Sequence, residues 1–288
     1  MKELELSAYA KVNICLDVLG RMDNGYHQVR MIMQTISLHD TLTLKICEEQ
    51  GIFLRTDKEE LGNAEDNLAY RAAKLLIEEC HLEKGIQIDL KKRIPIAAGM
   101  AGGSTDAAAV LRGMNQLYEL GLEQQELMNY GLKLGADVPY CIVGGTYLAE
   151  GIGEVLTALT NMPECYILAA KPPVGVSTKW VYENLSSPLV HPDVDGMLTD
   201  LAKGELIKLA SKMGNVLEKV TIERYPMIQS VKEAMEQKGA LKAMMSGSGP
   251  TVLGIFQTEE AMHQAYLAMG KEEPSLELFE TTMVYGYQ

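Results

Sequence analysis

The sequence predicts an α+β protein built from two domains. Three observations lead to this prediction: a long alternation of polar and apolar residues at the start, a small-residue loop between a strand and a helix, and strands mixed with helices in both halves. A chain of 288 residues is long enough for one large domain or two modest ones. Because apolar residues make up 47% of the chain, a packed core is expected.

The first expected element is a long strand at the start of the chain. Residues 4–18 alternate with a period of two, which predicts an extended strand with one buried face. This period places Lys11 and Asn13 on the same face. A turn at 20–25 contains Asn24-Gly25, a hairpin signal, and residues 29–46 then continue as strands at 31–36 and 41–46.

Helices alternate with strands in the rest of the first half. Apolar spacing predicts a helix over 67–80, capped by Asp66 or Asn67. A strand is expected at 86–90, followed by a small-residue segment and a helix from Ala107 to Tyr118. The next helix, at 123–134, ends at Gly135, a usual residue after a helix. Residues 141–148 are predicted to form a strand.

The second half repeats this mixture of elements. The predicted elements are a strand at 165–171, a loop at 172–178, helices near 179–185 and 204–218, a helix at 226–238 ending at Gly239, a strand followed by a glycine turn at 246–250, a strand at 251–256, a helix at 259–270 and a strand at 276–286. A domain boundary is plausible near 150–153.

Charge and cysteine content exclude several classes of protein. The net charge is −13, so the chain has no basic footprint for nucleic acid, and an anionic ligand must be held by a local feature. The five cysteines are odd in number and contain no C-x-x-C pair, which indicates neither a disulfide framework nor a zinc site. We expect reduced thiols, no signal peptide, no membrane span and a cytoplasmic location.

The small-residue segment Pro95–Ala109 is the strongest local signal. Glycine permits a positive φ and a close approach to a ligand, and the start of a helix offers free N–H groups. Together these features suit a phosphate group. Ser104 and Thr105 can cap the helix or donate to phosphate oxygens; the alternative is a tight turn with Ser104 as N-cap. The Walker A, dinucleotide and protein-kinase signatures are absent from the sequence.

This segment resembles the phosphate loop of the GHMP kinase superfamily, from which it departs at Met100, Ala101 and Thr105. Four further motifs occur in the order that the superfamily has them: Ala10-Lys-Val-Asn-Ile14, Gly25-Tyr-His27, Gly135-Ala-Asp-Val-Pro139 and Ser246-Gly-Ser-Gly-Pro250. Together they resemble the branch that uses ATP to phosphorylate the 2-hydroxyl of 4-diphosphocytidyl-2-C-methyl-D-erythritol in the non-mevalonate isoprenoid pathway.

The resemblance implies a two-domain GHMP kinase fold with the active site in the inter-domain cleft. The implied domains are an ATP-binding domain at 1–152, to which a final strand at about 280–288 returns, and a substrate-binding domain at 153–279. ATP is implied to bind at Asn67 and at the loop residues Pro95, Ile96, Ala97, Ala98, Gly99, Met100, Ala101, Gly102, Gly103, Ser104 and Thr105.

The resemblance also assigns roles around the acceptor. Asp137 is implied to be the catalytic base, and Lys11 to keep it ionised and to stabilise the charge of the phosphoryl group. Asn13 is implied to bind the alcohol end. The cytosine is expected between Tyr26 and Tyr182, with His27 at the base edge and Thr178 nearby. Ser246, Gly247, Ser248 and Gly249 form the implied supporting glycine loop.

Without the resemblance, these residues have other interpretations. Asp137 is equally a turn or capping residue, Lys11 a solvent-facing lysine on an edge strand, and Tyr26 a ring packed over a hairpin. The segment Ser246–Gly249 is then a plain β-turn.

The cofactors and partners follow from the same resemblance. Mg²⁺ is expected to arrive on the ATP phosphates, without a dedicated protein metal site. The partner is a small molecule, with no nucleic acid and no membrane, and the chain is expected to be a monomer or a weak homodimer. Rival functions are a homoserine- or mevalonate-type kinase and a non-catalytic nucleotide-binding relative.

Overall fold

The computed structural model describes residues 2–23, 25–58, 63–186 and 188–287, and it confirms the prediction of an α+β protein. Asn24 of the predicted hairpin turn lies outside the described residues. The chain forms two compact units, which are described separately. Unit 1 comprises Met1–Ala10, His39–Pro95 and Ala101–Val143, and unit 2 comprises Lys11–Leu38, Ile96–Met100 and Gly144–Gln288. The domain boundaries at 152 and 279 stay a prediction.

The strands of unit 1 form a small sheet around β4 (Gly85–Lys91). The second half of β2 (His27–Cys47) pairs antiparallel with β4, from Thr41↔Lys91 to Cys47↔Gly85. On the other side of β4, the strand β3 (Ile52–Thr56) pairs in parallel. The sequence pattern does not predict β3, because this five-residue strand at the sheet edge lies in a mainly polar stretch.

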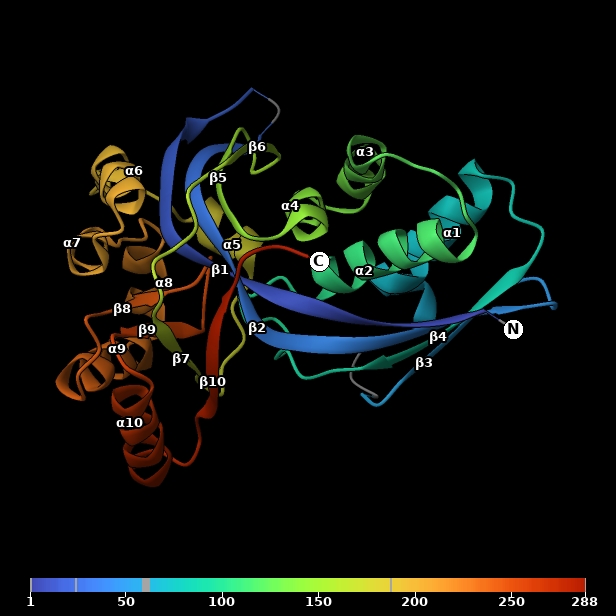
Figure 1. Ribbon diagram of the computed structural model, residues 1–288. Helices are drawn as coiled ribbons and strands as arrows, with labels where there is room; N and C mark the ends of the chain where they lie inside the picture. The colour runs from blue at the N-terminus through green and yellow to red at the C-terminus, as the bar shows by residue number, and fades with distance from the viewer. Residues whose placement is uncertain (1, 24, 59–62, 187, 288) are drawn as a thin grey trace. The chain divides into compact units, whose positions relative to one another are not determined.

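The helices of unit 1 lie on one side of these strands (Figure 1). They are η2 (Ala64–Asp66), α1 (Leu68–Glu79), α2 (Gly102–Leu117), α3 (Gln124–Leu134) and α4 (Val138–Val143). Helix α2 approaches the strands closely at Gly113, where a Cβ atom would lie 2.5 Å from Leu6 Cδ1 and 2.4 Å from Leu44 Cδ1. Small residues on α2 therefore allow its tight packing.

Two helix ends of unit 1 agree with their sequence signals, whereas one predicted strand is partly helical. The side chain of Asn67 caps α1 by accepting a 2.9 Å hydrogen bond from Ala69 N, and Gly135 follows α3. The strand predicted at 141–148 is wrong in its first half. Cys141 N donates to Asp137 O, an i→i−4 bond that makes 138–143 a helix, and the strand β5 (Thr146–Glu150) follows a positive-φ glycine pair.

Unit 2 contains an antiparallel sheet that begins with the first half of β2. Strand β10 (Glu277–Val284) pairs with β2 through Met283↔Ile36 and with β7 (Tyr166–Lys171) along its length. Strands β9 (Val252–Phe256) and β8 (Lys242–Met245) follow β7 in the sheet. Strand β5 pairs with β2 and with β6 (Val155–Ala158).

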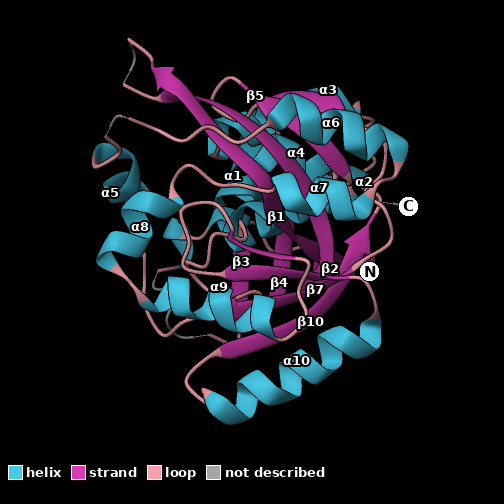
Figure 2. Cartoon of the chain, turned by 90° about the vertical axis from the view of Figure 1, so that its left-hand side faces the viewer, coloured by secondary structure: helices cyan, strands magenta, loops and turns pink. Residues whose placement is uncertain are grey.

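Six helices belong to the described part of unit 2: α5 (Thr178–Glu183), α6 (Val194–Lys203), α7 (Leu206–Lys212), α8 (Glu218–Arg224), α9 (Met227–Gln237) and α10 (Glu259–Glu272). Helix α10 runs along β10 and β7 (Figure 2). Helix α9 lies against β8 and β9. No helix in the residues that the structure describes is long and apolar enough to cross a membrane.

One predicted helix of unit 2 is interrupted. The range 204–218 contains α7 but reaches only the first residue of α8. A non-helical segment lies between the two helices, because Gly214 O and Val216 N bond to the main chain of Leu16. Helix α6 was not predicted; it ends at Gly204, which has a left-handed φ of 68°. Long-range pairing with a strand has overridden the helical tendency here.

The strand β1 (Glu3–Arg21) is longer and more buried than its alternation predicts. Its apolar parity is buried from Ala8 to Val18, but Lys11 and Asp17 are also only 5% exposed and Asn13 is fully buried. Parts of unit 2 far along the chain cover this polar face, since Ser246 bonds to Asn13 and the 214–216 segment pairs with Leu16. The expectation of a single buried face is therefore wrong.

Candidate functional site

The loop Pro95–Thr105 contains three residues in the left-handed region. These are Ala97 (φ 52°), Gly99 (φ 73°) and Ala101 (φ 55°). Ala101 stands where the superfamily has glycine, and it adopts this conformation despite its Cβ atom. Ala101 is also the residue before α2, so the helix starts at Gly102 and the alternative with Ser104 as N-cap is wrong.

The start of α2 has the features of an anion site. A helix of this length directs free N–H groups and the positive end of its dipole away from its first turn. Thr105 is fully buried, and its hydroxyl donates a 2.6 Å hydrogen bond to Tyr9 O. The proton of the Thr105 hydroxyl is therefore already donated to the main chain. Of the two hydroxyl groups, the one on Ser104 stays predicted to donate to a phosphate oxygen.

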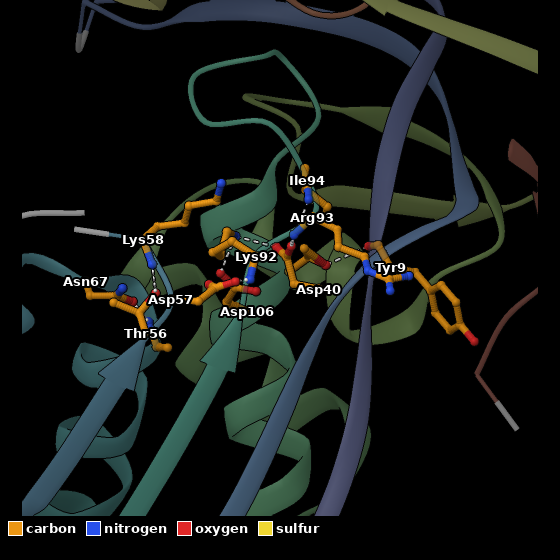
Figure 3. Close-up of polar contacts among 12 residues, drawn as sticks. Tyr9, Asp40, Thr56, Asp57, Lys58, Asn67, Lys92, Arg93, Ile94 and Asp106 are labelled. Carbon is orange, nitrogen blue, oxygen red and sulfur yellow. Dashed lines mark hydrogen bonds and ion pairs between the residues drawn. The ribbon is translucent and has the colours of Figure 1, made fainter. Parts of the chain in front are cut away.

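Three charged side chains lie together in unit 1, beside the start of α2. Lys92 Nζ contacts Asp40 and lies 2.7 Å from Asp106 Oδ2 (Figure 3). Asp40 Oδ1 also accepts hydrogen bonds from Arg93 N and Ile94 N, at 2.5 Å and 2.8 Å. A Cβ atom at Gly102 would lie 3.3 Å from Lys92 Nζ, so this ammonium group directly adjoins the phosphate loop.

Asp106 differs from Asp40 in its surroundings. It is 2% exposed, and its Oδ1 atom is buried with no hydrogen-bond partner. Burial raises the pKa of Asp106 well above its usual range, although Lys92 opposes the shift, and the adjacent Asp40 raises the pKa further. Lys92 is shared between two carboxyl groups, and Asp40 has the better hydrogen bonds. Asp106 is therefore the carboxyl group of this pair whose neutral form burial favours, as its raised pKa indicates.

In unit 2, a hydrogen bond between Lys11 and Asn13 confirms that their side chains lie on the same face of β1. Lys11 Nζ donates a 3.0 Å hydrogen bond to Asn13 Oδ1. Lys11 N donates to Met100 O at 3.2 Å, which connects this strand to the glycine loop. Because Lys11 is 5% exposed, the alternative of a solvent-facing lysine is wrong.

The turn Ser246–Pro250 contacts both β1 and the glycine loop. Ser246 Oγ donates a 3.0 Å hydrogen bond to Gly99 O and accepts one of 3.4 Å from Asn13 N. Gly247 lies against the same loop, since a Cβ atom there would be 3.3 Å from Gly99 O. These contacts agree with the predicted supporting role of the turn, which a plain surface β-turn would not fulfil.

The predicted cytosine-binding residues lie partly together. The His27 and Tyr182 rings are 5.1 Å apart and inclined by 35°. Tyr26 is 61% exposed. Burial and the nearby Arg21 charge lower the pKa of His27, which favours a neutral imidazole at neutral pH.

Thr178 connects α5 to the turn at 246–250. Its hydroxyl lies 2.7 Å from Ser248 Oγ, and Tyr182 follows one helical turn later on α5. The residues predicted for the substrate and for the supporting loop therefore share a hydrogen bond.

Asp137 lies in unit 1, in the turn between α3 and α4. It is half-buried and its main-chain oxygen accepts the hydrogen bond from Cys141 N. This location agrees with a turn residue and leaves the predicted catalytic role of its carboxylate as a prediction. Among the described residues, no group of three or more His, Cys, Asp or Glu side chains is arranged to hold a metal ion.

Family models match both halves of the chain. The model described as the N-terminal domain of GHMP kinases matches residues 67–145, and the model described as the GHMP kinase C-terminal domain matches 197–275. The chain belongs to the GHMP kinase family. The resemblance inferred from the motifs is thereby confirmed, together with the predicted GHMP kinase fold class.

Individual GHMP kinases are similar to the chain over nearly its whole length. Relatives from Lachnospira eligens and Lachnoclostridium phytofermentans are 53% and 50% identical, cover 91% and 92% of this chain, and are themselves covered to 92%. Both are named 4-diphosphocytidyl-2-C-methyl-D-erythritol kinase. A crystal structure of 4-(cytidine 5'-diphospho)-2C-methyl-D-erythritol kinase matches with a TM-score of 0.84 and 31% identity, covering 99% of this chain and all of that chain.

More distant GHMP kinases share the fold. The homoserine kinase of Cytophaga hutchinsonii matches with a TM-score of 0.79 at 21% identity, covering 100% of this chain and 96% of that chain. At this identity the likeness concerns the fold alone.

Two parts of the site have no clear signal in the local sequence. Nothing in the sequence around Lys92 indicates that it meets Asp40, 52 positions away. Asn215, which bonds to the turn around Ser246, lies in a segment predicted as helix. A polar residue beside Gly214 was the one available signal that this helix is broken.

Proposed function

We propose that the protein transfers the γ-phosphate of ATP to the 2-hydroxyl of 4-diphosphocytidyl-2-C-methyl-D-erythritol, as a step of the non-mevalonate isoprenoid pathway. The observation that carries the proposal is the 53% identity over 91% of the chain to a relative with this named activity. The buried Lys11–Asn13 pair and the His27–Tyr182 ring contact support it from the structure.

Asp137 accepts the proton of the 2-hydroxyl, because an alcohol is a poor nucleophile until its proton is taken. The phosphoryl group passes directly to the acceptor oxygen, without a covalent enzyme intermediate. Lys11 stabilises the negative charge on the transferring group, and Asn13 binds the alcohol end through its amide. In phosphoryl transfer, positioning and charge stabilisation supply most of the catalysis, so few groups suffice.

The phosphates of ATP bind at the glycine loop and the start of α2, where left-handed residues and free N–H groups fit an anion. Asn67 contacts the adenosine; its Oδ1 caps α1, so its Nδ2 is the atom for this contact. Mg²⁺ reaches the site on the ATP phosphates, since Mg²⁺ usually keeps phosphate and water ligands. It supplies further charge neutralisation there.

The cytosine stacks between Tyr26 and Tyr182, with the neutral His27 at the base edge and Thr178 nearby. By analogy with base–aromatic stacking, each ring contributes roughly 1–3 kcal/mol. The five free cysteines agree with a cytoplasmic location. We further propose a monomer or a weak homodimer.

The test is ADP release by the purified protein with ATP, Mg²⁺ and a panel of alcohols. The panel contains the cytidylated erythritol, mevalonate, homoserine, and a no-acceptor control. We expect ADP release above the control only with the cytidylated erythritol. Release with mevalonate or homoserine instead indicates another GHMP kinase activity, and release with none of them indicates a non-catalytic relative.

A further inference from the structure

The segment between α7 and α8 is attached to β1. Leu16 N donates a 2.9 Å hydrogen bond to Gly214 O, and Val216 N donates one of 3.0 Å to Leu16 O. These two bonds form a short parallel bridge centred on Leu16 and Asn215. The backbone of Asn215 is therefore held beside Leu16, which follows Asn13 by three residues on β1.

The side chain of Asn215 is 7% exposed and uses both of its N–H groups. Nδ2 donates to Met245 O and to Gly247 O, each at 2.7 Å. Oδ1 accepts a 2.9 Å bond from Leu217 N, which keeps the amide in this orientation. The amide group of asparagine has two N–H donors for these two carbonyl oxygens. A carboxylate has the same shape but no donor, so aspartate cannot replace it.

The two carbonyl groups held by Asn215 flank Ser246. A neighbouring residue supports the same strand end, because Glu218 Oε1 accepts a 2.7 Å hydrogen bond from Met245 N. Ser246 is fully buried between these fixed points. Its hydroxyl bonds to Gly99 O in the glycine loop and to Asn13 N in β1.

We propose that Asn215 is a positioning residue for phosphoryl transfer. By holding the carbonyl groups on either side of Ser246, it sets the Ser246 hydroxyl between Gly99 and Asn13. The glycine loop is thereby aligned with the strand that carries Lys11. The inference rests on the proposed function and extends it to a residue whose side chain bonds to the main chain around Ser246.

A small displacement of the glycine loop affects the rate and the binding of the nucleotide more than it affects the affinity for the acceptor. A misplacement of about 1 Å caused far from the reacting atoms can reduce the rate about 100-fold. We expect Asn215→Asp to lower kcat at least about tenfold while the KM of the acceptor changes less than about threefold. Asn215→Ala should lower kcat less than Asn215→Asp, because the carboxylate faces two carbonyl oxygens.

Asn115 on α2 is the matched control, since its Nδ2 donates to Leu122 O and its Oδ1 accepts from Leu122 N, both at 3.0 Å. Asn115→Asp removes a comparable structural amide bond and should leave kcat within about twofold of wild type. All variants are assayed at a temperature where circular dichroism shows the folded state. A purely structural role for Asn215 predicts the same small change of kcat at both asparagines.

A double-mutant cycle with Ser246→Ala tests the route of the effect. If Asn215 acts through Ser246, the fold-loss of kcat in Asn215→Ala/Ser246→Ala is smaller than the product of the two single losses. Losses that multiply, or a ranking in which Ala is worse than Asp, overturn the proposal. Failure of both Asn215 variants to fold also overturns it, because the residue is then a general determinant of stability.

The wild-type protein separates this proposal from the proposed function. Absence of ADP release with every acceptor refutes the function. The positioning role is then measured by calorimetric binding of ADP, for which Asn215→Asp should show at least about tenfold weaker affinity and Asn115→Asp an unchanged one. Equal ADP affinities in both variants overturn the positioning role.

Discussion

Gly99 and Ser246 approach so closely that no side chain fits between them: a Cβ atom at Gly99 would lie 2.3 Å from the main-chain oxygen of Ser246. Gly99 also has a φ of 73°, a backbone conformation that L residues with a side chain rarely adopt. The glycine loop and the turn at 246–250 are thus pressed backbone to backbone. This contact leads to the first prediction.

We expect Gly99→Ala to lower kcat/KM at least about 100-fold, because the loop must move to relieve the backbone clash. The measurement is ADP release with the cytidylated erythritol, together with thermal unfolding. Gly204→Ala is the matched control: its φ is 68° and no atom lies within 4 Å of an added Cβ. It should cost about 1–2 kcal/mol of stability and leave kcat/KM unchanged. Near-normal activity of Gly99→Ala contradicts a rigid loop contact.

The second prediction concerns the pH dependence of stability at Asp106. Burial raises its pKa in the folded state above the ordinary 3.8. The stability that its neutral form contributes is therefore full below about pH 3.8 and is lost as pH rises through the raised pKa. Asparagine holds no titrating proton, so Asp106→Asn should gain stability relative to wild type as pH increases.

The measurement is urea unfolding of wild type and Asp106→Asn at several values between about pH 4 and 8. Asp66→Asn, which alters an exposed carboxylate of the same unit, is the control and should show no such trend. A stability difference that stays constant over this range would show that Asp106 is ionised throughout.

The third prediction tests Asp137 as the base. Asp137→Asn keeps the size of the side chain but removes its capacity to accept a proton, so kcat should fall about 100- to 10,000-fold. The KM of ATP should change little. Asp193→Asn is the control, because Asp193 caps α6 by accepting from Gly196 N and the amide can keep this bond. Wild-type-like ADP release in Asp137→Asn removes this residue from the mechanism.

The fourth prediction concerns the cytosine clamp. Loss of one stacked ring in Tyr26→Ala should raise the KM of the acceptor roughly 5- to 150-fold, as expected for about 1–3 kcal/mol, and leave the KM of ATP unchanged. Tyr26→Phe keeps the ring and should behave like wild type. The control Tyr285→Ala removes another exposed tyrosine, 48% exposed, without effect. An unchanged acceptor KM in Tyr26→Ala excludes the clamp.

Several features follow from local sequence alone. The period of β1, the Asn67 cap of α1, and the glycines that follow α3 and α9 all depend on residues within a few positions of one another. Such patterns reflect backbone preferences and capping, which neighbouring residues decide. The five ordered motifs were likewise sufficient to identify the GHMP kinase family.

Other features depend on contacts between distant segments. The helix predicted at 204–218 is broken because Gly214 and Val216 pair with Leu16, about 200 positions earlier in the chain. Residues 141–143, predicted as the start of a strand, belong to helix α4. In both places local propensity was too weak to decide the outcome.

What the sequence by itself determined is the family, the mixed fold class and the identity of the residues in each motif. Only the tertiary structure decided that the polar face of β1 is buried and that Ala101 takes a left-handed conformation. It alone also decided that Ser246 bonds to Gly99, 147 positions away, and that Asn215 holds the carbonyl groups beside it. The physical reason is that buried polar atoms need hydrogen-bond partners. The folded chain brings these partners together from distant positions, which the local sequence pattern does not determine.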